Sequence, residues 1–264
     1  MSNIIQINNL NKSFGSVNAV QNLSFRVKKG ELFAFLGING AGKSTTFNAI
    51  TGAFYVDEGQ IILDGEDITY KKEFLRSKVI GHLFQDPLKG TAPHMTIEEN
   101  MALAYLRASG KENAFFSRIR KSEKFRELLS QLDMGLEDRM KQPVGLLSGG
   151  QRQALTLLMA TMVTPKILLL DEHTAALDPA TAEKVLELTK KIIAEHHITC
   201  LMVTHNMHQA LELGNRILMM DSGNIVLDLK DEEKKKMTVD SLLEQFRIQA
   251  GKRLDNDRIL MSAQ

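Results

Sequence analysis

The chain has 264 residues, enough for one large α/β domain or for a core with an added lobe. Its 33 basic and 32 acidic residues nearly cancel, to a net charge of +1, whereas a nucleic-acid-binding protein usually carries a clear basic excess. The one cysteine, Cys200, excludes a disulfide within the chain and suits a buried thiol in a reducing compartment. We find no signal-peptide pattern and no apolar run near the ~18 residues of a membrane span, so we expect any role at a membrane to come through a partner.

The first third of the chain predicts strands on either side of a glycine-rich turn and a helix. Residues 4–8 and 23–27 alternate apolar and polar side chains, as half-buried strands do. Residues 32–37 are a continuous apolar run that ends in glycine, which is typical of a strand covered on both faces. A helix is expected at about 43–51. Further strands are expected at residues 61–65 and 79–84.

The middle of the chain, from about residue 89 to residue 163, has a helical pattern. Residues 97–108 and 123–134 place apolar side chains at three- and four-residue spacing, with charges between them. The basic segment 115–124, FFSRIRKSEK, is expected to be an amphipathic helix of this region. Contact with a partner or with lipid headgroups is the alternative interpretation of that segment.

Strands and helices alternate again after the helical region. The expected elements are a strand at 166–171, a helix at 180–195, a strand at 198–204, a short helix, strands at 216–220 and 224–228, and a helix at 238–248. The charged run KDEEKKK at residues 230–236 is expected to be a linker or a solvated helix face. Alternation at both ends with a helical insertion predicts an α/β fold, with a mostly parallel sheet and a projecting helical lobe.

A phosphate-binding turn is predicted at residues 37–45, where GINGAGKST satisfies the P-loop pattern. Glycines let backbone N–H groups converge on phosphate oxygens, and the helix that follows points its positive dipole end at the same anion. Lys43 would reach the β- and γ-phosphates, and Ser44 would bind Mg²⁺. The predicted nucleotide-binding residues of this turn are Gly37, Asn39, Gly40, Ala41, Gly42, Lys43, Ser44 and Thr45.

Two carboxylates and an imidazole follow the apolar strand KILLL, at Asp171, Glu172 and His173. Taken alone, they could form a metal site, an acid/base pair or a polar strand end without chemistry. Beside a P-loop, the strand is expected to deliver Asp171 to the carboxyl edge of the sheet, where it would hold Mg²⁺ directly or through water. Glu172 would face the γ-phosphate and polarise the attacking water.

A second anion-binding helix start is predicted in LLSGGQRQALTLLMA, residues 146–160. A serine and two glycines open this helix, so its first N–H groups are accessible to an anion. One chain then has two phosphate-binding helix starts but one P-loop. The economical arrangement is a head-to-tail dimer, in which the P-loop of one copy and this segment of the other enclose each ATP. The residues concerned are Ser148, Gly149, Gly150 and Gln151.

With LSGGQ added to the P-loop, the chain resembles the ATP-binding subunits of ABC transporters over nearly its whole length. The resemblance implies a P-loop NTPase fold with a RecA-like, mostly parallel sheet, an antiparallel β subdomain and an inserted α-helical lobe. It assigns residues 1–88 and 164–228 to the nucleotide-binding core with its β subdomain. It assigns residues 89–163 to the helical lobe and residues 229–264 to a C-terminal helical tail.

The same resemblance implies roles for residues outside these motifs. Gln85 matches the Q-loop glutamine, which senses the γ-phosphate and Mg²⁺ and contacts the membrane partner. Asp178 matches the D-loop aspartate at the dimer interface, and His205 matches the switch histidine that contacts the γ-phosphate. Phe14 matches the aromatic residue that stacks on adenine; it is Phe rather than the commoner Tyr, and it keeps the π-face. The implied catalytic residues are Lys43, Glu172 and His205, and the implied magnesium ligands are Ser44, Gln85 and Asp171.

The resemblance also implies cofactors and partners. The cofactors are ATP and Mg²⁺. The partners are a second copy of the chain, transmembrane permease subunits and, indirectly, an extracytoplasmic substrate-binding protein. The expected location is peripheral, on the cytoplasmic face of the inner membrane. The segment TAPHMTIEEN at residues 91–100 resembles importer-type subunits and favours import over export.

One position departs from the family pattern, because most members have proline where this chain has His173. Histidine restores the backbone freedom and the N–H that proline lacks. We expect His173 to be a structural replacement for proline, with an influence on the surroundings of Glu172 as the alternative. The segment DEHTAALDP, residues 171–179, and residues 85–105 resemble a bacterial subgroup of ABC ATPases. Members of this subgroup accompany amino-acid-type permeases, some of them for tryptophan or tyrosine uptake.

Two other classes of protein fit the sequence less well. Non-transport ABC ATPases that act on DNA or the ribosome usually carry long coiled-coil insertions or two cassettes in one chain, and this chain has neither. A DExH-type helicase is suggested by the letters D-E-H. It fails because His173 immediately follows Glu172 and because LSGGQ is present.

Overall fold

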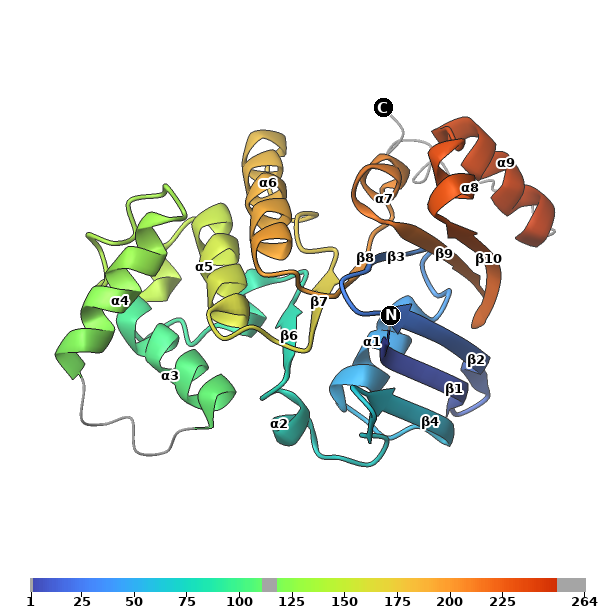
Figure 1. The fold of residues 1–264 in the computed structure, drawn as a ribbon, viewed down its shortest axis with the longest axis horizontal. Coiled ribbons are helices and arrows are strands. Elements are labelled where there is room, and N and C mark those ends of the chain that lie inside the picture. The colour runs from blue at the N-terminus through green and yellow to red at the C-terminus, as the bar shows by residue number, and fades with distance from the viewer. Residues whose placement is uncertain (1, 111–117, 251–264) are drawn as a thin grey trace. The chain divides into compact units, whose positions relative to one another are not determined.

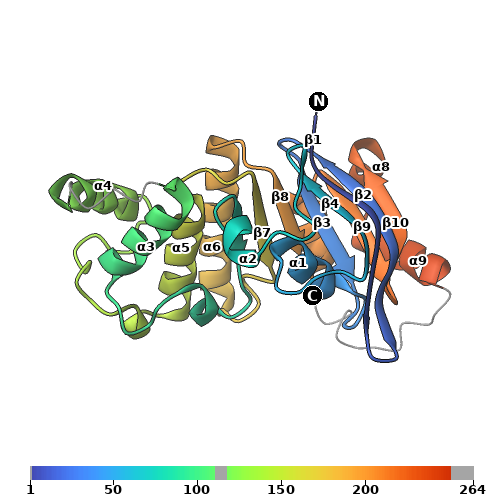
Figure 2. The same ribbon diagram turned by 90° about the horizontal axis from the view of Figure 1, so that it is seen from below.

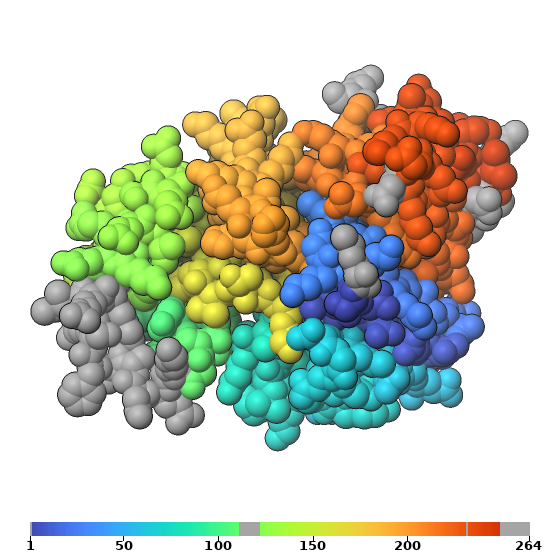
Figure 3. Space-filling model, in the orientation of Figure 1, coloured from blue at the N-terminus to red at the C-terminus, as the bar shows by residue number. Residues whose placement is uncertain are grey.

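The computed structural model describes residues 2–110 and 118–250, and these form two compact units (Figure 1). Unit 1 comprises Met1–Arg76 and Thr199–Gln264, and unit 2 comprises Ser77–Ile198. In the space-filling view, unit 1 is blue to cyan and orange to red, whereas unit 2 is mainly green and yellow (Figure 3).

Two of the predicted segments reach beyond the described residues. Residues 115–117 of the predicted amphipathic helix and residues 251–264 of the predicted tail lie outside them. The predicted assignment of the chain to a nucleotide-binding core, a lobe and a tail stays a prediction.

Unit 1 contains a four-stranded antiparallel sheet with the strand order β2-β1-β4-β5 (Figure 1). Its strands are β1 (Asn3–Phe14), β2 (Val17–Lys28), β4 (Glu58–Leu63) and β5 (Glu66–Asp67). The strands predicted at 4–8 and 23–27 are confirmed, and pairing extends them into one hairpin that reaches Phe14 opposite Val17. β4 ends at Leu63 rather than at residue 65, because Asp64 has a φ of 51° and begins the turn into β5.

A second sheet of unit 1 has the strand order β10-β9-β3-β8 and is mostly parallel. It contains β3 (Leu32–Gly37), β8 (Cys200–Val203), β9 (Arg216–Asp221) and β10 (Asn224–Lys230), with the helices α1 (Lys43–Thr51) and α7 (Met207–Leu213) in the connections. β3 lies between β8 and β9, and Phe33, Ala34 and Phe35 are fully buried, as the continuous apolar run predicts. Burial of Cys200 raises the pKa of its thiol, so it is the inert core cysteine that was expected.

Two helices follow β10 and lie beside it (Figure 2). The charged run predicted to be a linker or a solvated helix face forms α8 (Asp231–Lys235), with Glu232 and Glu233 exposed. α9 (Val239–Ala250) buries Leu242, Leu243 and Phe246, so the predicted last helix is confirmed.

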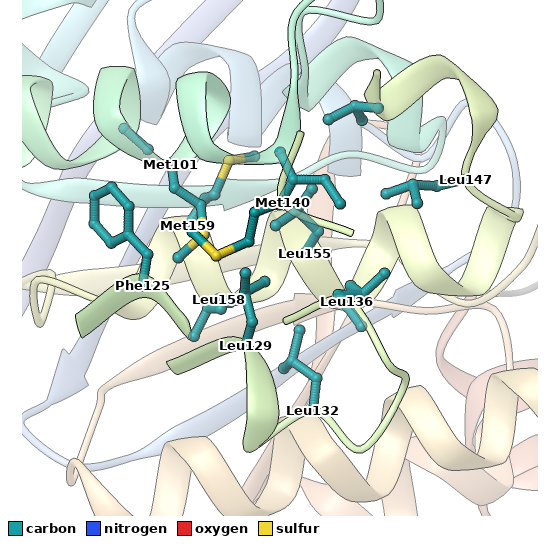
Figure 4. Packing of buried hydrophobic residues seen from close by; sticks show 14 residues of the cluster. Met101, Phe125, Leu129, Leu132, Leu136, Met140, Leu147, Leu155, Leu158 and Met159 are labelled. Atoms are coloured by element: carbon teal, nitrogen blue, oxygen red, sulfur yellow. The ribbon is translucent and has the colours of Figure 1, made fainter. Parts of the chain in front are cut away.

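Unit 2 combines a parallel strand pair with helices. Its elements are β6 (Ile80–Leu83), η1 (Pro87–Gly90), α3 (Ile97–Ser109), α4 (Arg118–Ser130), η3 (Val144–Leu146), α5 (Gly149–Thr161), β7 (Ile167–Asp171) and α6 (Pro179–Glu195). Side chains of α3, α4 and α5 share one hydrophobic cluster, in which Phe125 and Leu129 of α4 lie with Met159 of α5 (Figure 4). No helix within residues 2–110 and 118–250 has both the length and the apolar character that a membrane crossing requires.

The helix predicted at 123–134 is displaced toward the N-terminus, since α4 runs from Arg118 to Ser130. The chain turns after α4, where Leu132 N donates to Leu129 O and Asp133 has a φ of 51°. A left-handed residue cannot continue a right-handed helix. Leu132, beyond the end of α4, still packs into the hydrophobic cluster. The apolar spacing of a helix therefore continues in the sequence past Ser130, where the helix itself ends.

Arg76 anchors unit 1 through four carbonyls and was not anticipated from the sequence. This residue of α2 (Glu73–Arg76) is only 1% exposed. Its guanidinium donates to Ala49 O at 2.7 Å and Ile50 O at 3.0 Å, in the last turn of α1. It also donates to Lys71 O at 2.8 Å and Thr69 O at 2.9 Å. It therefore satisfies carbonyls at a helix end that the helix itself leaves unpaired.

An Arg76→Met variant is expected to lower the free energy of unfolding by about 2–4 kcal/mol, because methionine fills the space but leaves buried carbonyls without a donor. Urea denaturation followed by circular dichroism measures this change. Arg247→Met is the control: that side chain is exposed and its ion pair with Glu244 is long, at 4.0 Å, so a change within about 0.5 kcal/mol is expected. Equal stability of the two variants would contradict the anchoring role.

Candidate active site

The glycine-rich turn links β3 directly to α1, as the sequence predicts. Gly42 precedes the helix with a φ of 100°, and a Cβ there would lie 2.5 Å from Ala19 O. Any larger residue would therefore be both strained and obstructed. Gly42 also has no side chain to cap the first N–H groups of α1, so they can bind an anion.

Lys43 is held inside this turn and is 6% exposed. Its Nζ donates to Gly37 O at 2.7 Å and to Ile38 O at 3.0 Å. Asn39, Gly40 and Ser44 are exposed, whereas Ala41 and Gly42 are buried. The turn thus presents backbone, an ammonium group and a hydroxyl at one helix start, which is the donor set that a polyphosphate requires.

Phe14, at the end of β1, presents a half-exposed ring. Phe54 meets it edge-on, with ring centroids 5.3 Å apart and an interplanar angle of 89°. Lys12 Nζ lies 5.4 Å from the ring centroid. A core role for Phe14 is therefore excluded, and an aromatic face remains accessible to a planar ligand. Its stacking on adenine stays a prediction.

His205 follows β8 and is exposed. β3 and β8 are parallel, with Phe35 opposite Val203, so His205 and the P-loop leave neighbouring strands at the same edge of the sheet. A short capped turn holds this position, because Asn206 N donates to Thr204 Oγ1 and the Asn206 side chain caps α7. The fold of unit 1 therefore brings together two of the predicted phosphate-contacting groups.

Gln85, Asp171 and Glu172 gather at the corresponding edge of unit 2. β6 and β7 are parallel, with Leu83 opposite Leu170, so the residues that follow the two strands are neighbours. Gln85 Nε2 donates to Glu172 Oε2 at 3.5 Å. Strand pairing thus brings the predicted site residue Gln85 beside Asp171 and Glu172, which lie more than eighty positions later in the chain.

Glu172 has a strained backbone, with a φ of 44°. A non-glycine residue in the left-handed region costs about 1–3 kcal/mol and persists only when its surroundings hold it there. Such strain concentrates at active sites, because it aims a side chain that an ordinary strand end would point elsewhere. The sequence gives no signal for it.

His173, the next residue, is buried, with 3% of its surface exposed. Its Nε2 lies 3.3 Å from Thr189 Oγ1 in α6. Burial lowers its pKa to about 4, so the ring is neutral at neutral pH. The imidazole therefore packs under the strand end and does not face solvent as a third polar group beside the carboxylates.

The LSGGQ segment opens α5 with a capping box formed by Ser148 and Gln151. Ser148 and Gly149 are exposed, and the preceding Leu146 is 70% exposed. A Cβ on Gly150 would lie 2.0 Å from Thr181 Cγ2, so only glycine permits this approach of α5 to α6. The result is an exposed helix start beside an exposed apolar side chain, which suits an anion and a protein partner together.

Arg152 and Gln153 directly follow LSGGQ, residues 147–151, which we call the signature. Both support the position of the signature, and neither was anticipated from the sequence. Arg152 donates to Gly145 O at 3.1 Å and to Leu147 O at 2.9 Å, which braces the loop before α5. Gln153 is fully buried, and its Nε2 donates to Phe84 O at 3.5 Å, directly before Gln85. A polar residue in the apolar half of a predicted helix is the sequence signal that could have identified Gln153.

Asp178, predicted to lie at a dimer interface, is exposed and caps α6 by accepting from Thr181 N at 3.1 Å. Hydrogen bonds from the side chain and then the backbone of Thr181 lower the pKa of this carboxyl. Helix capping accounts for its position within the chain. A contact with a second copy stays a prediction.

The described parts of both units contain no group of three or more His, Cys, Asp or Glu side chains that could hold a metal ion. Mg²⁺ instead prefers one or two carboxylates together with phosphate and water oxygens. The Ser44 hydroxyl, the Gln85 carboxamide and the Asp171 carboxylate are oxygen donors of that kind. Each unit therefore carries oxygen donors of the kind that Mg²⁺ prefers, and their joint role as magnesium ligands stays a prediction.

Comparisons of the sequence and of the structure with known proteins point to the same family. The family model for the ABC transporter matches residues 20–175. A tyrosine transport ATP-binding protein of Clostridioides difficile (strain R20291) is 45% identical over 249 residues, which cover 92% of this chain and 98% of that protein.

Two solved structures also align over most of the chain. The ATP-binding cassette MJ1267 in its ADP conformation is 28% identical, with a TM-score of 0.76 and coverage of 94% of this chain and 99% of that one. The dimeric cassette MJ0796, in a post-hydrolysis state bound to ADP and Pi, is 28% identical, with a TM-score of 0.73 and coverage of 86% and 98%. The chain thus belongs to the ABC transporter family and is an ATP-binding cassette, an ATPase with the P-loop NTPase fold.

Proposed function

We propose that this chain is the energy-supplying subunit of an amino-acid importer. Two copies close head to tail on two ATP molecules, and closure moves the permease subunits to which they are attached. Hydrolysis of ATP then separates the copies and resets the cycle. The chain works at the cytoplasmic face of the inner membrane, and a substrate-binding protein outside the membrane delivers the solute to the permease.

The exposed start of α5 carries this proposal. The chain has two helix starts suited to phosphate, one at Gly42–Lys43 in unit 1 and one at Ser148–Gly149 in unit 2. Each presents backbone N–H groups and the positive end of a helix dipole. In a head-to-tail dimer, the start of α5 in one copy faces the P-loop of the other, and the two helix starts enclose each ATP. The dimeric form in which the similar cassette MJ0796 was solved supports the pairing of two copies.

Each predicted residue has a role in this cycle. Lys43 neutralises the phosphates that the P-loop N–H groups bind. Glu172 accepts a proton from the attacking water, and His205 contacts the γ-phosphate from the neighbouring strand. Ser44, Gln85 and Asp171 would hold Mg²⁺, which would offset negative charge on the phosphate oxygens. Phe14 stacks on adenine, and Asp178 contacts the second copy.

An aromatic amino acid is the proposed cargo. The tyrosine transport relative matches this chain over nearly its full length at 45% identity. In this proposal the site residues serve ATP chemistry, and the permease and the binding protein select the cargo. Identification of membrane proteins that co-purify with the chain, followed by uptake assays with labelled amino acids, tests this part of the proposal.

A Ser148→Arg variant is expected to prevent ATP-driven dimerisation. Arginine would replace the exposed cap with a long side chain at the point where the other copy presents its γ-phosphate. Size-exclusion chromatography with ATP measures the effect, in a Glu172→Gln background that prevents hydrolysis. We expect Glu172→Gln alone to elute as a dimer and the double variant as a monomer.

Ser130→Arg in the same background is the matched control, since Ser130 is also an exposed serine at a helix end of unit 2. It should dimerise like its parent. Dimerisation of the Ser148→Arg variant at the same ATP concentration would exclude the head-to-tail arrangement.

A further inference from the structure

Glu172 needs an external support for its left-handed backbone. Its φ of 44° lies in a region that residues other than glycine occupy only when neighbouring contacts impose it. One support is within the turn, where Ala175 N donates to Glu172 O at 2.9 Å. This bond fixes the carbonyl side of Glu172 but does not connect the turn to the rest of unit 2.

The connection is made by His173. Its ring is buried against α6, where Nε2 lies 3.3 Å from Thr189 Oγ1, and both residues are 3% exposed. Thr189 Oγ1 lies 2.7 Å from Val185 O, a carbonyl that can only accept. The threonine hydrogen is therefore directed to Val185, and the threonine oxygen accepts from His173. This assigns the Nε2–H tautomer to His173.

The loop from Glu172 to Asp178 is thereby held at both ends. Asp178 caps the first turn of α6, and His173 is bonded to Thr189 further along the same helix. α6 is a 17-residue helix with five buried residues, so it is a firm support. A loop attached to one rigid helix at two points has little freedom to change the backbone angle at Glu172.

We propose that His173 and Thr189 form a positioning pair that holds Glu172 in its left-handed conformation. The pair keeps the Glu172 carboxylate where it meets Gln85, with 3.5 Å between Oε2 and Nε2. His173 is buried against α6 and acts through the backbone of its neighbour Glu172. The inference rests on the proposed function, because it takes Glu172 as the base that activates water.

Removal of the threonine hydroxyl tests the pair. Thr189→Val keeps the shape of the side chain but leaves the Nε2–H of His173 without its acceptor. We expect kcat for ATP hydrolysis to fall about five- to tenfold, the effect of one lost hydrogen bond on the aim of the base. The KM for ATP should stay within about twofold, because Glu172 does not bind the ground-state nucleotide.

Thr161→Val is the matched control. Thr161 is also a helix threonine of unit 2 with 3% exposure, and its hydroxyl bonds the carbonyl four residues earlier, Leu157 O, at 2.8 Å. It differs because the carbonyls its hydroxyl bonds, Leu157 O and Leu158 O, lie in its own helix α5 and not in the loop that carries Glu172. Its kcat should match that of the wild type. Equal kcat values for Thr189→Val and Thr161→Val would overturn the proposal.

Two substitutions of His173 separate hydrogen bonding from packing. His173→Gln can place an amide N–H near the position of Nε2, so its kcat should approach the wild-type value. His173→Leu lacks the donor and should lose about as much as Thr189→Val, with no further loss in the double variant. A glutamine variant no better than the leucine variant, or additive losses, would contradict a positioning bond. A wild-type chain without ATPase activity would instead contradict the proposed function.

Discussion

A Glu172→Gln chain is expected to bind ATP as the wild type does but to hydrolyse it at least about 100-fold more slowly. Glutamine has the same shape as glutamate and can still accept the hydrogen bond from Gln85 Nε2, so the site keeps its geometry. The amide cannot accept a proton from water, and a positioned general base contributes about 10²–10⁴-fold to such a step. Phosphate release measures the rate, and equilibrium binding of labelled ATP measures the affinity.

The slow variant should also accumulate as an ATP-bound dimer, because closure precedes hydrolysis in the proposed cycle. Glu187→Gln, an exposed position on α6, is the control and should hydrolyse at the wild-type rate. Hydrolysis by Glu172→Gln near the wild-type rate would remove Glu172 from the role of base. The left-handed backbone at this position would then require another explanation.

The nucleotide-binding strand and helix were predictable because their signals are local. The expected boundaries 32–37 and 43–51 agree with β3 and α1, since an apolar run, a glycine turn and a helix start each depend on adjacent residues. The P-loop spacing also fixes which residues lie at the helix start.

The supports of the site were not predictable, because each joins residues far apart in the chain. Arg76 bonds carbonyls of α1 that lie 26 and 27 positions earlier, and Gln153 bonds Phe84 across 69 positions. Nothing in the sequence pairs these residues. The resemblance to ABC ATPases identified His173 as a departure from the family pattern, but its acceptor at Thr189 is evident only from the packing of the loop against α6.

The left-handed backbone of Glu172 could not be predicted from the sequence for a related reason. An aspartate and a glutamate after an apolar strand predict the strand end, but both an extended and a left-handed glutamate are compatible with that pattern. The tertiary contact of His173 with Thr189, together with the turn bond from Ala175 N to Glu172 O, decides between them. The sequence therefore predicts Glu172 as the base from its chemistry, whereas the backbone conformation that aims its side chain is a property of the fold.

A Lys43→Ala chain is expected to bind ATP at least about tenfold more weakly and to hydrolyse it about 100- to 1,000-fold more slowly. Lys43 is the ammonium held at the P-loop, and loss of a charged donor to a phosphate removes about 1.5–3 kcal/mol of binding. Loss of a preorganised donor in the transition state costs the larger factor in rate. Lys29→Ala, an exposed lysine of unit 1, is the control and should behave as the wild type. Normal hydrolysis by Lys43→Ala would refute the P-loop assignment.

The same variant gives a decisive test of the dimer when it is mixed with Ser148→Arg. Each variant alone has two defective sites, because every site uses one P-loop and one signature. In a mixed dimer, the intact P-loop of the Ser148→Arg copy meets the intact signature of the Lys43→Ala copy, so one complete site forms. We therefore expect ATPase activity to reappear on mixing. Its upper limit is set by the fraction of mixed dimers that random pairing produces, because each mixed dimer has one complete site. If each chain instead formed its site alone, mixing would restore nothing, since activity would be the average of two inactive proteins.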